Sequence, residues 1–272
     1  MAEIDLLDAL RRRLRELERV VVAFSGGADS AFLAWVANDT LGPSACSVVT
    51  AVSASLAGEE AADCAALAEE WGLRWTTVAT DELARPAYVA NDTDRCAHCK
   101  SELMDALAPL AGAGAGAGAG ATIVLGTNLD DLHDHRPGQA AAAARGAAFP
   151  LVDAGFTKAA VREASRGLGL RTWDKPAAAC LASRVPYGTP VTLGVLDRVG
   201  RAEAALHRLG FPQVRVRHYG DVARLEFELA DLPAAVERRQ SVVDAVKAAG
   251  YSRVTIDLEG FRSGNLNPRP PA

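Results

Sequence analysis

The spacing of hydrophobic residues in the first part of the chain predicts an amphipathic helix followed by a buried strand. Residues 4–19 carry leucines at every third or fourth position, which is the period of one helix face: Leu7, Leu10, Leu14 and Leu17. Residues 20–24 then form a continuous hydrophobic run that ends in Ser-Gly-Gly, as expected of a buried parallel strand and the turn after it. A second helix is predicted from about Ser30.

The same alternation continues to about residue 125. Strands are predicted over residues 46–52, 74–78 and 122–125, and a helix is predicted around Cys64 to Trp71. Strands that alternate with helices indicate an α/β fold built on a doubly wound parallel sheet. In such sheets the ligand lies at the carboxyl ends of the strands.

The pattern changes after about Pro190. Residues 213–217, 223–227 and 253–258 alternate strictly between apolar and charged positions, which predicts strands with one packed face and one polar face. Helical stretches are predicted near residues 195–209 and 232–249. We therefore expect two domains, an α/β domain over residues 1–188 and a smaller α+β domain over residues 189–272.

Composition excludes several functional classes. The 272 residues include 29 Lys and Arg against 34 Asp and Glu, so the net charge of −5 gives no general attraction to nucleic acid or to an anionic membrane. The N-terminus lacks the pattern of a secretory signal, and we expect a cytoplasmic protein. Residues 106–128 are uncharged and contain the Ala-Gly tract 111–120, which is expected to be a flexible connection and not a membrane span.

The segment Ser25-Gly26-Gly27-Ala28-Asp29-Ser30 follows the first predicted strand and opens a helix. Glycines let a phosphate approach the backbone, and serine hydroxyls and helix N-terminal amides donate to it. Asp29 suits such a site if Mg²⁺ bridges its carboxylate to the phosphate. The chain has neither a Walker A lysine nor G-x-G-x-x-G. The alternative is an ordinary strand-to-helix corner with a capping side chain.

Gly126-Thr127-Asn128 follows a later strand and is expected at the same edge of the sheet. By itself this segment is equally compatible with a turn rich in helix-capping residues.

The five cysteines divide into two groups. Cys96 and Cys99 have a spacing that can chelate a soft metal or the iron of a cluster, and Cys180 is the candidate third ligand of a [4Fe–4S] cluster with one open iron. A redox dithiol and a structural zinc site are the alternatives. Cys46 lies in a strand and Cys64 on an apolar helix stripe, so both are expected to be inert core residues.

Arginines gather in the second domain. Arg215 and Arg217 project to one face of a strand, Glu226 of the next strand is expected to share that face, and Arg262 follows the last strand. Guanidinium groups on one face suit a phosphate or carboxylate ligand, and a solvated sheet surface is the alternative.

These motifs together resemble the LarE family of ATP pyrophosphatases, which are sulfur transferases of nickel-pincer cofactor biosynthesis. The resemblance runs from about residue 20 to 267 and rests on SGGADS, GTNLDD, DHRPG, FPLVDAGFTKAAVREASRGLGL, WDKPAAACLASRVPYGTPVT, QVRVRHYGDVARLE and the EGFRSGNLN tail. The Ala-Gly tract departs from the family pattern. The resemblance implies an adenine nucleotide α-hydrolase-like fold.

The resemblance also implies an activity. ATP would adenylate a carboxylate of pyridinium-3,5-biscarboxylate mononucleotide, releasing pyrophosphate, and sulfur insertion would give the thiocarboxylate. By resemblance, the ATP-binding positions are Ser25, Gly26, Gly27, Asp29, Ser30, Gly126, Thr127 and Asn128. The substrate-binding positions implied in the same way are Ser183, Arg184, Arg215, Arg217, Glu226 and Arg262.

The source of the sulfur remains open between two family mechanisms. In one, Cys180 is consumed and becomes dehydroalanine. In the other, which resembles this sequence more closely, Cys96, Cys99 and Cys180 hold a [4Fe–4S] cluster that presents sulfide. The family implies a homo-oligomer, a hexamer, and ATP with Mg²⁺ as cofactors. A tRNA thiolase, an amide-forming pyrophosphatase and a non-enzymatic metal-binding module are the alternatives.

Overall fold

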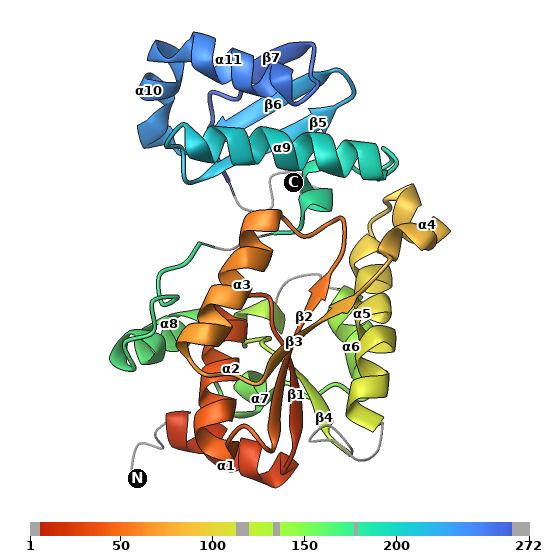
Figure 1. Ribbon diagram of the computed structural model, residues 1–272, viewed down its shortest axis with the longest axis vertical. Coiled ribbons are helices and arrows are strands. Elements are labelled where there is room, and N and C mark those ends of the chain that lie inside the picture. Colours follow the sequence, from red (N-terminus) through yellow and green to blue (C-terminus); the bar gives the residue numbers. More distant parts are fainter. Residues whose placement is uncertain (1–5, 113–119, 133–136, 177–178, 263–272) are drawn as a thin grey trace, which may run out of the picture. The chain divides into compact units, whose positions relative to one another are not determined.

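The computed structural model describes residues 6–112, 120–132, 137–176 and 179–262 (Figure 1). The chain divides into two compact units. The first comprises Met1–Ser53, Glu59–Glu82 and Cys96–Ala178, and the second comprises Ala54–Gly58, Leu83–Arg95 and Ala179–Ala272. Each unit has its own hydrophobic core.

The first unit is built on a parallel sheet, as the sequence predicts. Its strands are β1 (Val20–Ala23), β2 (Cys46–Val52), β3 (Trp75–Ala79) and β4 (Thr122–Leu125). They pair in the order β3-β2-β1-β4, with Val20 opposite both Cys46 and Thr122. Strands β2 and β3 are therefore added on one side of β1, and β4 is added on the other side. Doubly wound sheets bind ligands at this change in strand order, between β1 and β4.

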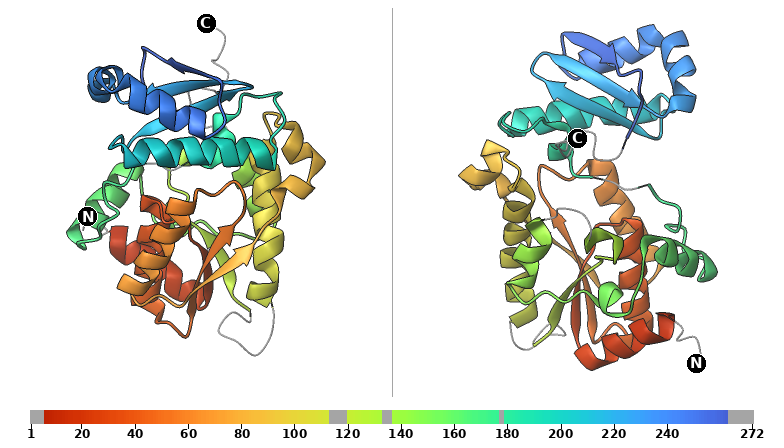
Figure 2. Two further views of the ribbon diagram at one scale, coloured as in Figure 1. Left: turned by 45° about the horizontal axis from the view of Figure 1, so that its top comes forward. Right: turned by 180° about the vertical axis from the view of Figure 1, so that it is seen from behind.

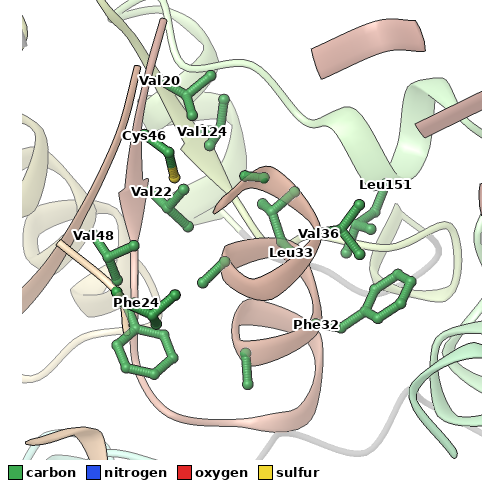
Figure 3. Close-up of a cluster of buried hydrophobic side chains, with 14 of the residues drawn as sticks. Val20, Val22, Phe24, Phe32, Leu33, Val36, Cys46, Val48, Val124 and Leu151 are labelled. Carbon is green, nitrogen blue, oxygen red and sulfur yellow. The ribbon is translucent and has the colours of Figure 1, made fainter. Parts of the chain in front are cut away.

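Helices cover both faces of this sheet (Figure 2), and the alternation of side chains along β1 decides what each face contacts. Val20 and Val22 face one layer (Figure 3), and Val21 faces the other. The first layer consists of α1 (Leu6–Leu17), α2 (Ala28–Leu41), α3 (Gly58–Glu70), α7 (Pro150–Asp153) and α8 (Lys158–Gly167). The second consists of α5 (Arg95–Gly112) and α6 (Pro137–Ala143).

Part of the uncharged segment is helical, which corrects the expectation of a flexible connection. Residues 106–112 form the end of α5, with Pro109 inside the helix. The helix forms because Met104 and Leu107 are buried against the sheet, and this packing outweighs weak helix propensity. Of the Ala-Gly tract, residues 113–119 lie outside the described residues. None of the helices in the described ranges is long and apolar enough to cross a membrane.

The second unit is a small α+β structure, also as predicted. Strands β5 (Val214–Tyr219) and β6 (Val222–Phe227) are antiparallel, and β7 (Arg253–Ile256) pairs parallel to β6. The helices are α9 (Leu193–Arg208), α10 (Leu232–Glu237) and α11 (Arg239–Ala248). Val214, Val216 and Phe227 belong to its core, so one face of the sheet is packed.

Short helices complete the two units. They are η1 (Glu82–Ala84), α4 (Pro86–Ala90), η2 (Asp130–Leu132), η3 (Leu181–Arg184) and η4 (Leu229–Asp231).

The second unit begins at Ala179 and also takes in residues 54–58 and 83–95, whereas the sequence predicts a boundary between residues 188 and 189. The difference has a local cause, because Ser55 accepts a hydrogen bond from the Leu181 amide and Asn91 donates to three carbonyls of residues 185–189. These contacts join chain segments far apart in sequence and cannot be inferred from hydrophobic spacing.

Candidate functional site

The two segments proposed to bind nucleotide lie side by side at one edge of the first unit's sheet. Ser25-Gly26-Gly27 follows β1 and Gly126-Thr127-Asn128 follows β4, and the ends of these strands are paired, Ala23 opposite Leu125. The structure thus brings the ATP-binding candidates of the first unit together at the reversal point of the sheet.

The loop after β1 is organised by serine hydroxyls. The Ser30 hydroxyl accepts a hydrogen bond from the Ser25 amide at 3.2 Å and donates to the Gly27 carbonyl at 3.2 Å. The Ser25 and Ser30 hydroxyls are 3.0 Å apart. These bonds close the turn at the N-terminus of α2, where the backbone amides of a helix are available to an anion.

Glycine is required at two positions of this site. Gly26 has a φ of +70°, and a Cβ there would lie 2.8 Å from Cys64 Sγ. At Gly126 a Cβ would lie 2.8 Å from both the N and Cα atoms of Ser30. The loop after β4 therefore packs directly against the backbone of α2, and a side chain at either glycine would separate the parts of the site.

Asn128 is held in one orientation. Its Oδ1 accepts hydrogen bonds from the Asp130 and Asp131 amides, at 3.0 and 3.2 Å, which start η2. Its Nδ2 must therefore point the other way, toward Asp29. In the part of the chain that the structure describes, Asn128 Nδ2 and Asp29 Oδ1 are both buried without a hydrogen-bond partner. Unsatisfied buried polar atoms are rare in folded proteins, so each of these two atoms is a candidate ligand contact.

The environment of Asp29 disfavours its charged form. Burial raises the pKa of this carboxyl, the Asn128 side chain lowers it in part, and the Asp131 carboxylate raises it again. Lys158 and Arg162 lower the pKa more weakly. Burial outweighs these favourable groups, so the charged carboxylate is only partly compensated, which suits a group that binds a cation.

Lys175 was missed by the sequence analysis and lies beside this loop. Its Nζ donates to Glu60 Oε2 at 2.8 Å and to Asp63 Oδ2 at 2.6 Å, and it would be 3.7 Å from a Cβ at Gly26. Burial alone would lower the pKa of Lys175, but the two carboxylates outweigh it and raise the pKa. Only the fold could reveal this residue, because Glu60 is 115 positions away.

The cysteines fall into a buried and an accessible group, as the sequence predicts; four of them lie in the first unit, and Cys180 lies in the second. Cys46 and Cys64 are buried in the core of the first unit, and burial raises the pKa of both thiols, that of Cys46 to about 12. Cys96 and Cys99 lie in the first turn of α5, where Cys99 Sγ donates to Glu82 Oε1 at 3.8 Å.

The third ligand candidate, Cys180, is exposed at the start of η3 in the second unit. Within the described ranges, no three His, Cys, Asp or Glu side chains converge on a metal site. The cluster with Cys96 and Cys99 therefore stays a prediction.

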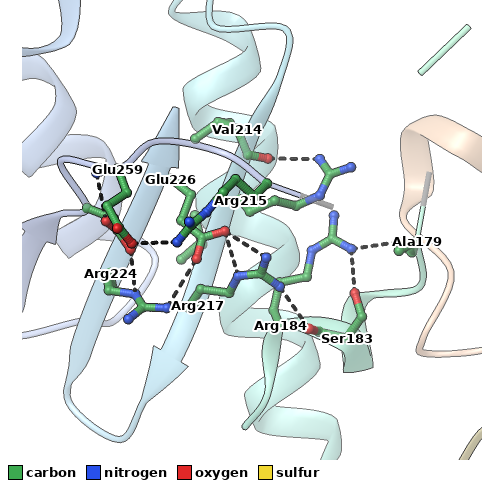
Figure 4. A network of polar contacts seen from close by, with 12 residues as sticks. Ala179, Ser183, Arg184, Val214, Arg215, Arg217, Arg224, Glu226 and Glu259 are labelled. Carbon is green, nitrogen blue, oxygen red and sulfur yellow. Dashed lines mark hydrogen bonds and ion pairs between the residues drawn. The ribbon is translucent and has the colours of Figure 1, made fainter. Parts of the chain in front are cut away.

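The second unit contains a cluster of buried arginines and glutamates (Figure 4). Arg184 binds Glu203 through two hydrogen bonds of 2.9 and 2.8 Å. Arg217 binds Glu226 Oε2 at 2.9 and 2.6 Å and the Ser183 carbonyl at 3.0 Å. Strand pairing sets Arg215 opposite Glu226, so these side chains share one face as expected.

This face is not a solvated surface, which contradicts that alternative. Arg215 is 7% exposed, Arg217 5% and Glu226 0%. Burial and the positive charge of Arg184 lower the pKa of Arg215 to about 10. Its guanidinium also lies 5.0 Å from the Phe261 ring centre. Crowded, partly desolvated cations are suited to receive an anion.

Two other substrate-binding candidates differ in their surroundings. The Ser183 hydroxyl accepts a hydrogen bond from Arg184 Nη1 at 2.9 Å and so belongs to the cluster. Arg262 has a side chain that is 43% exposed and forms an ion pair with Glu259.

Comparisons with known proteins agree with this arrangement. The sequence profile of the NAD synthase family matches residues 5–106, which contain the Ser25-Gly26-Gly27 loop. The chain is 46% identical over 263 residues to an uncharacterised protein of Synechocystis sp., covering 96% of both chains. It is 37% identical over 254 residues to the pyridinium-3,5-bisthiocarboxylic acid mononucleotide synthase of Lactiplantibacillus plantarum, covering 93% of this chain and 91% of the relative. An uncharacterised protein of Methanocaldococcus jannaschii is 24% identical over 261 residues.

Proposed function

Because this chain belongs to the LarE family, the family of pyridinium-3,5-bisthiocarboxylic acid mononucleotide synthases, we propose that it is an ATP-dependent sulfur transferase of nickel-pincer cofactor biosynthesis. It would adenylate a carboxylate of pyridinium-3,5-biscarboxylate mononucleotide and insert sulfur to give the thiocarboxylate. The observation that carries the proposal is the pairing of a Gly-Gly loop with an unsatisfied Asp29–Asn128 pair at the sheet edge, in a chain 37% identical to a named synthase.

In the adenylation step, a substrate carboxylate oxygen attacks the α-phosphorus of ATP and forms a new P–O bond. Pyrophosphate leaves with the electron pair of the P–O bond that breaks. The Gly26–Gly27 backbone and the α2 N-terminus would hold the phosphates. Asp29 fits a Mg²⁺ ligand because its Oδ1 is buried without a hydrogen-bond partner within the described residues. Lys175 stands beside the same loop, where it is paired with Glu60 and Asp63.

The buried arginines of the second unit would bind the phosphate of the mononucleotide. Arg215 and Arg217 belong to the desolvated face described above, and Ser183 and Arg184 lie on the segment that follows Cys180. Arg262, on the exposed side, would join them, and Glu226 would hold Arg217 in place. Charge-assisted bonds to guanidinium groups are the stronger class of hydrogen bond, so they suit anchoring of a phosphate.

In the second step, a sulfur nucleophile attacks the acyl carbon and AMP leaves with the electron pair of the C–O bond. The exposed or partly exposed thiols Cys96, Cys99 and Cys180 would hold a [4Fe–4S] cluster, and their accessibility fits this, whereas Cys46 and Cys64 are buried. When bound, the cluster would supply the sulfide. In the competing mechanism Cys180 itself attacks, and its Cβ–Sγ bond then breaks with loss of the α-proton to leave dehydroalanine.

Anaerobic purification followed by turnover tests the proposal. Incubation with ATP, Mg²⁺ and the biscarboxylate nucleotide should release AMP and pyrophosphate and form the thiocarboxylate. ADP with phosphate as products would exclude the assignment. Conversion with ammonia to an amide would instead indicate the amide-forming reaction of NAD synthases, whose profile matches residues 5–106.

The same preparation separates the two sulfur sources. The cluster mechanism predicts about four irons per chain and loss of repeated turnover in Cys96→Ala, Cys99→Ala and Cys180→Ala, with Cys46→Ala as the control. Sacrifice of Cys180 predicts one turnover in Cys96→Ala and Cys99→Ala. It also predicts a protein that is lighter by the mass of hydrogen sulfide.

A further inference from the structure

The segment that carries Cys180 is held by side chains that the proposed chemistry does not use. Residues 179–191 contain little regular structure apart from η3, so their backbone carbonyls must find partners outside a helix or sheet. Two buried residues just before the C-x-x-C pair, Asn91 and Arg95, bind four of these carbonyls. All of these residues belong to the second unit.

Asn91 is the centre of this arrangement. It is fully buried and has a positive φ of 59° after α4. Its Nδ2 donates to the carbonyls of Val185 at 3.3 Å, Pro186 at 2.8 Å and Thr189 at 2.8 Å. Its own carbonyl accepts from the Gly188 amide at 3.1 Å. Since carbonyls only accept, the amide nitrogen must face them, and the amide oxygen faces Arg95.

Arg95 extends the contact toward Cys180. Its Nη1 donates to Asn91 Oδ1 and, at 2.9 Å, to the carbonyl of Ala182, which is two residues after Cys180. Arg95 is 5% exposed, and its guanidinium lies 5.8 Å from the Tyr187 ring centre. The chain continues from Arg95 directly into Cys96. We call Asn91 and Arg95 the carbonyl clamp.

On its other side Cys180 is held by Arg184. This guanidinium donates to the carbonyls of Ala179 at 2.7 Å and Cys180 at 3.1 Å, and the Leu181 amide donates to the Ser55 carbonyl at 2.9 Å. The Cys180 side chain is exposed, whereas Leu181 and Ala182 are buried. The position of the thiol therefore depends on a backbone that is fixed at both sides.

We propose that the carbonyl clamp formed by Asn91 and Arg95 positions Cys180 for sulfur transfer to the activated carboxylate. This inference rests on the proposed function and adds two positioning residues to it. If sulfur does not attack the acyl adenylate, water hydrolyses it. Hydrolysis regenerates the carboxylate and releases AMP. A displaced Cys180 should therefore lower the yield of sulfur transfer more than it lowers the release of AMP.

The decisive variant is Arg95→Met, which keeps the length of the side chain and removes both donated hydrogen bonds. We expect the thiocarboxylate formed per AMP released to fall about tenfold, since hydrogen bonds from a charged donor are among the stronger ones. Arg95→Lys, which keeps one charged donor, should be intermediate. Val242→Ala, in the core of the same unit, should lower the melting temperature without changing this ratio.

An unchanged ratio in folded Arg95→Met overturns the proposal, and so does a proportional fall in Val242→Ala at equal loss of stability. If Arg95→Met does not fold, the ratio in Arg95→Lys decides in the same way. Absence of AMP and thiocarboxylate with the wild-type protein would refute the proposed function instead.

Hydrogen–deuterium exchange tests the clamp without substrate. In Arg95→Lys the amides of residues 181–191 should exchange about tenfold faster than in the wild type, while those of β5 and β6 remain unchanged. Equal exchange over residues 181–191 would show that Arg95 does not hold the segment, whatever reaction the protein catalyses.

Discussion

At the scale of single residues, the partial burial of the Asp29 carboxyl is unfavourable to the fold of the first unit. Asp29 Oδ1 is buried and has no hydrogen-bond partner among the described residues, and burial raises the pKa of the carboxyl, so the charged form costs free energy. The arrangement is understandable if the missing partner arrives with the ligand. Function and stability of the ligand-free protein should therefore oppose each other at this residue.

Asp29→Asn should raise the melting temperature of the ligand-free protein at pH 7 and abolish release of AMP and pyrophosphate. Because the pKa in the folded state lies above the unfolded value, Asp29 favours folding at low pH, and this contribution is lost as pH rises through the folded pKa. The difference in melting temperature between Asp29→Asn and the wild type should therefore disappear below about pH 4. Calorimetry across pH measures the two melting temperatures, with Asp153→Asn as an exposed control. A melting temperature of Asp29→Asn below that of the wild type at pH 7 would contradict the prediction.

Arg215 shows a similar conflict in the second unit, since burial and the neighbouring Arg184 lower its pKa to about 10. Arg215→Met should weaken binding of the phosphorylated substrate about tenfold and leave ATP binding unchanged. It should not lower the melting temperature, because it removes a like charge. Titration calorimetry with each ligand tests this, with the exposed Arg253→Met as the control; equal substrate affinity in both variants would exclude Arg215 from the site.

At the scale of elements, the site depends on how closely the loop after β4 approaches α2. The contact between Gly126 and Ser30 involves backbone atoms, which cannot move without shifting a whole element. The contact between Gly26 and Cys64 involves a side chain, so it can be relieved. The two glycines should therefore respond differently to substitution.

Gly26→Ala should destabilise the protein through both its positive φ and its contact with Cys64, and adding Cys64→Ala should recover only the second part. The remaining conformational cost is about 1–2 kcal/mol. Gly126→Ala should gain nothing from Cys64→Ala. Urea unfolding of each single and double variant gives the free energies of unfolding from which the two double-mutant cycles are calculated. Full recovery of Gly26→Ala by Cys64→Ala would mean that the backbone conformation imposes no cost.

Among elements of the second unit, η3 and α9 are joined by the Arg184–Glu203 ion pair, whose side chains are 4% and 6% exposed. Glu203 also accepts a hydrogen bond from the Val216 amide at 2.9 Å. Glu203→Gln leaves a buried guanidinium without its counter-charge and should cost about 3–5 kcal/mol of unfolding free energy. The exposed Arg201–Asp197 pair serves as control, and Asp197→Asn should cost less than about 1 kcal/mol in the same unfolding experiment.

At the scale of the whole molecule, the two units have separate cores and should respond differently to pH. The core of the second unit contains His218, 5% exposed, whose Nδ1 lies 3.1 Å from the Tyr251 hydroxyl. Burial lowers the pKa of His218, and the charge of Arg198 lowers it further, while Asp221 raises it in part. The imidazole of His218 is therefore neutral in the folded protein at pH 7.

Because the folded pKa of His218 lies below that of the unfolded chain, unfolding takes up a proton as pH falls below about 6.5. The second unit should lose stability between that pH and the folded pKa, and His218→Gln should remove this dependence. Tryptophan fluorescence follows the first unit, which contains Trp35, Trp71, Trp75 and Trp173, so far-UV circular dichroism is needed beside it. An unaltered pH dependence in the variant would assign the effect to other groups.

The sequence by itself determined the elements that hydrophobic spacing defines and the motifs that local chemistry defines. The strand over residues 46–52 and the strand over residues 122–125 were predicted at their observed bounds, because each is a short, largely apolar run without charged residues. The same holds for the parallel sheet and for the burial of Cys46 and Cys64, since both follow from short-range patterns.

The tertiary structure alone decided what requires contact between distant residues. The end of α5 is helical because the sheet buries Met104 and Leu107. Lys175 lies beside the loop after β1 and pairs with Glu60 and Asp63 of α3, and Asn91 reaches carbonyls 94 to 98 positions away. No spacing rule encodes these partners, because hydrogen-bond and packing energies depend on distance in space, and the sequence fixes that distance only after the whole chain has folded.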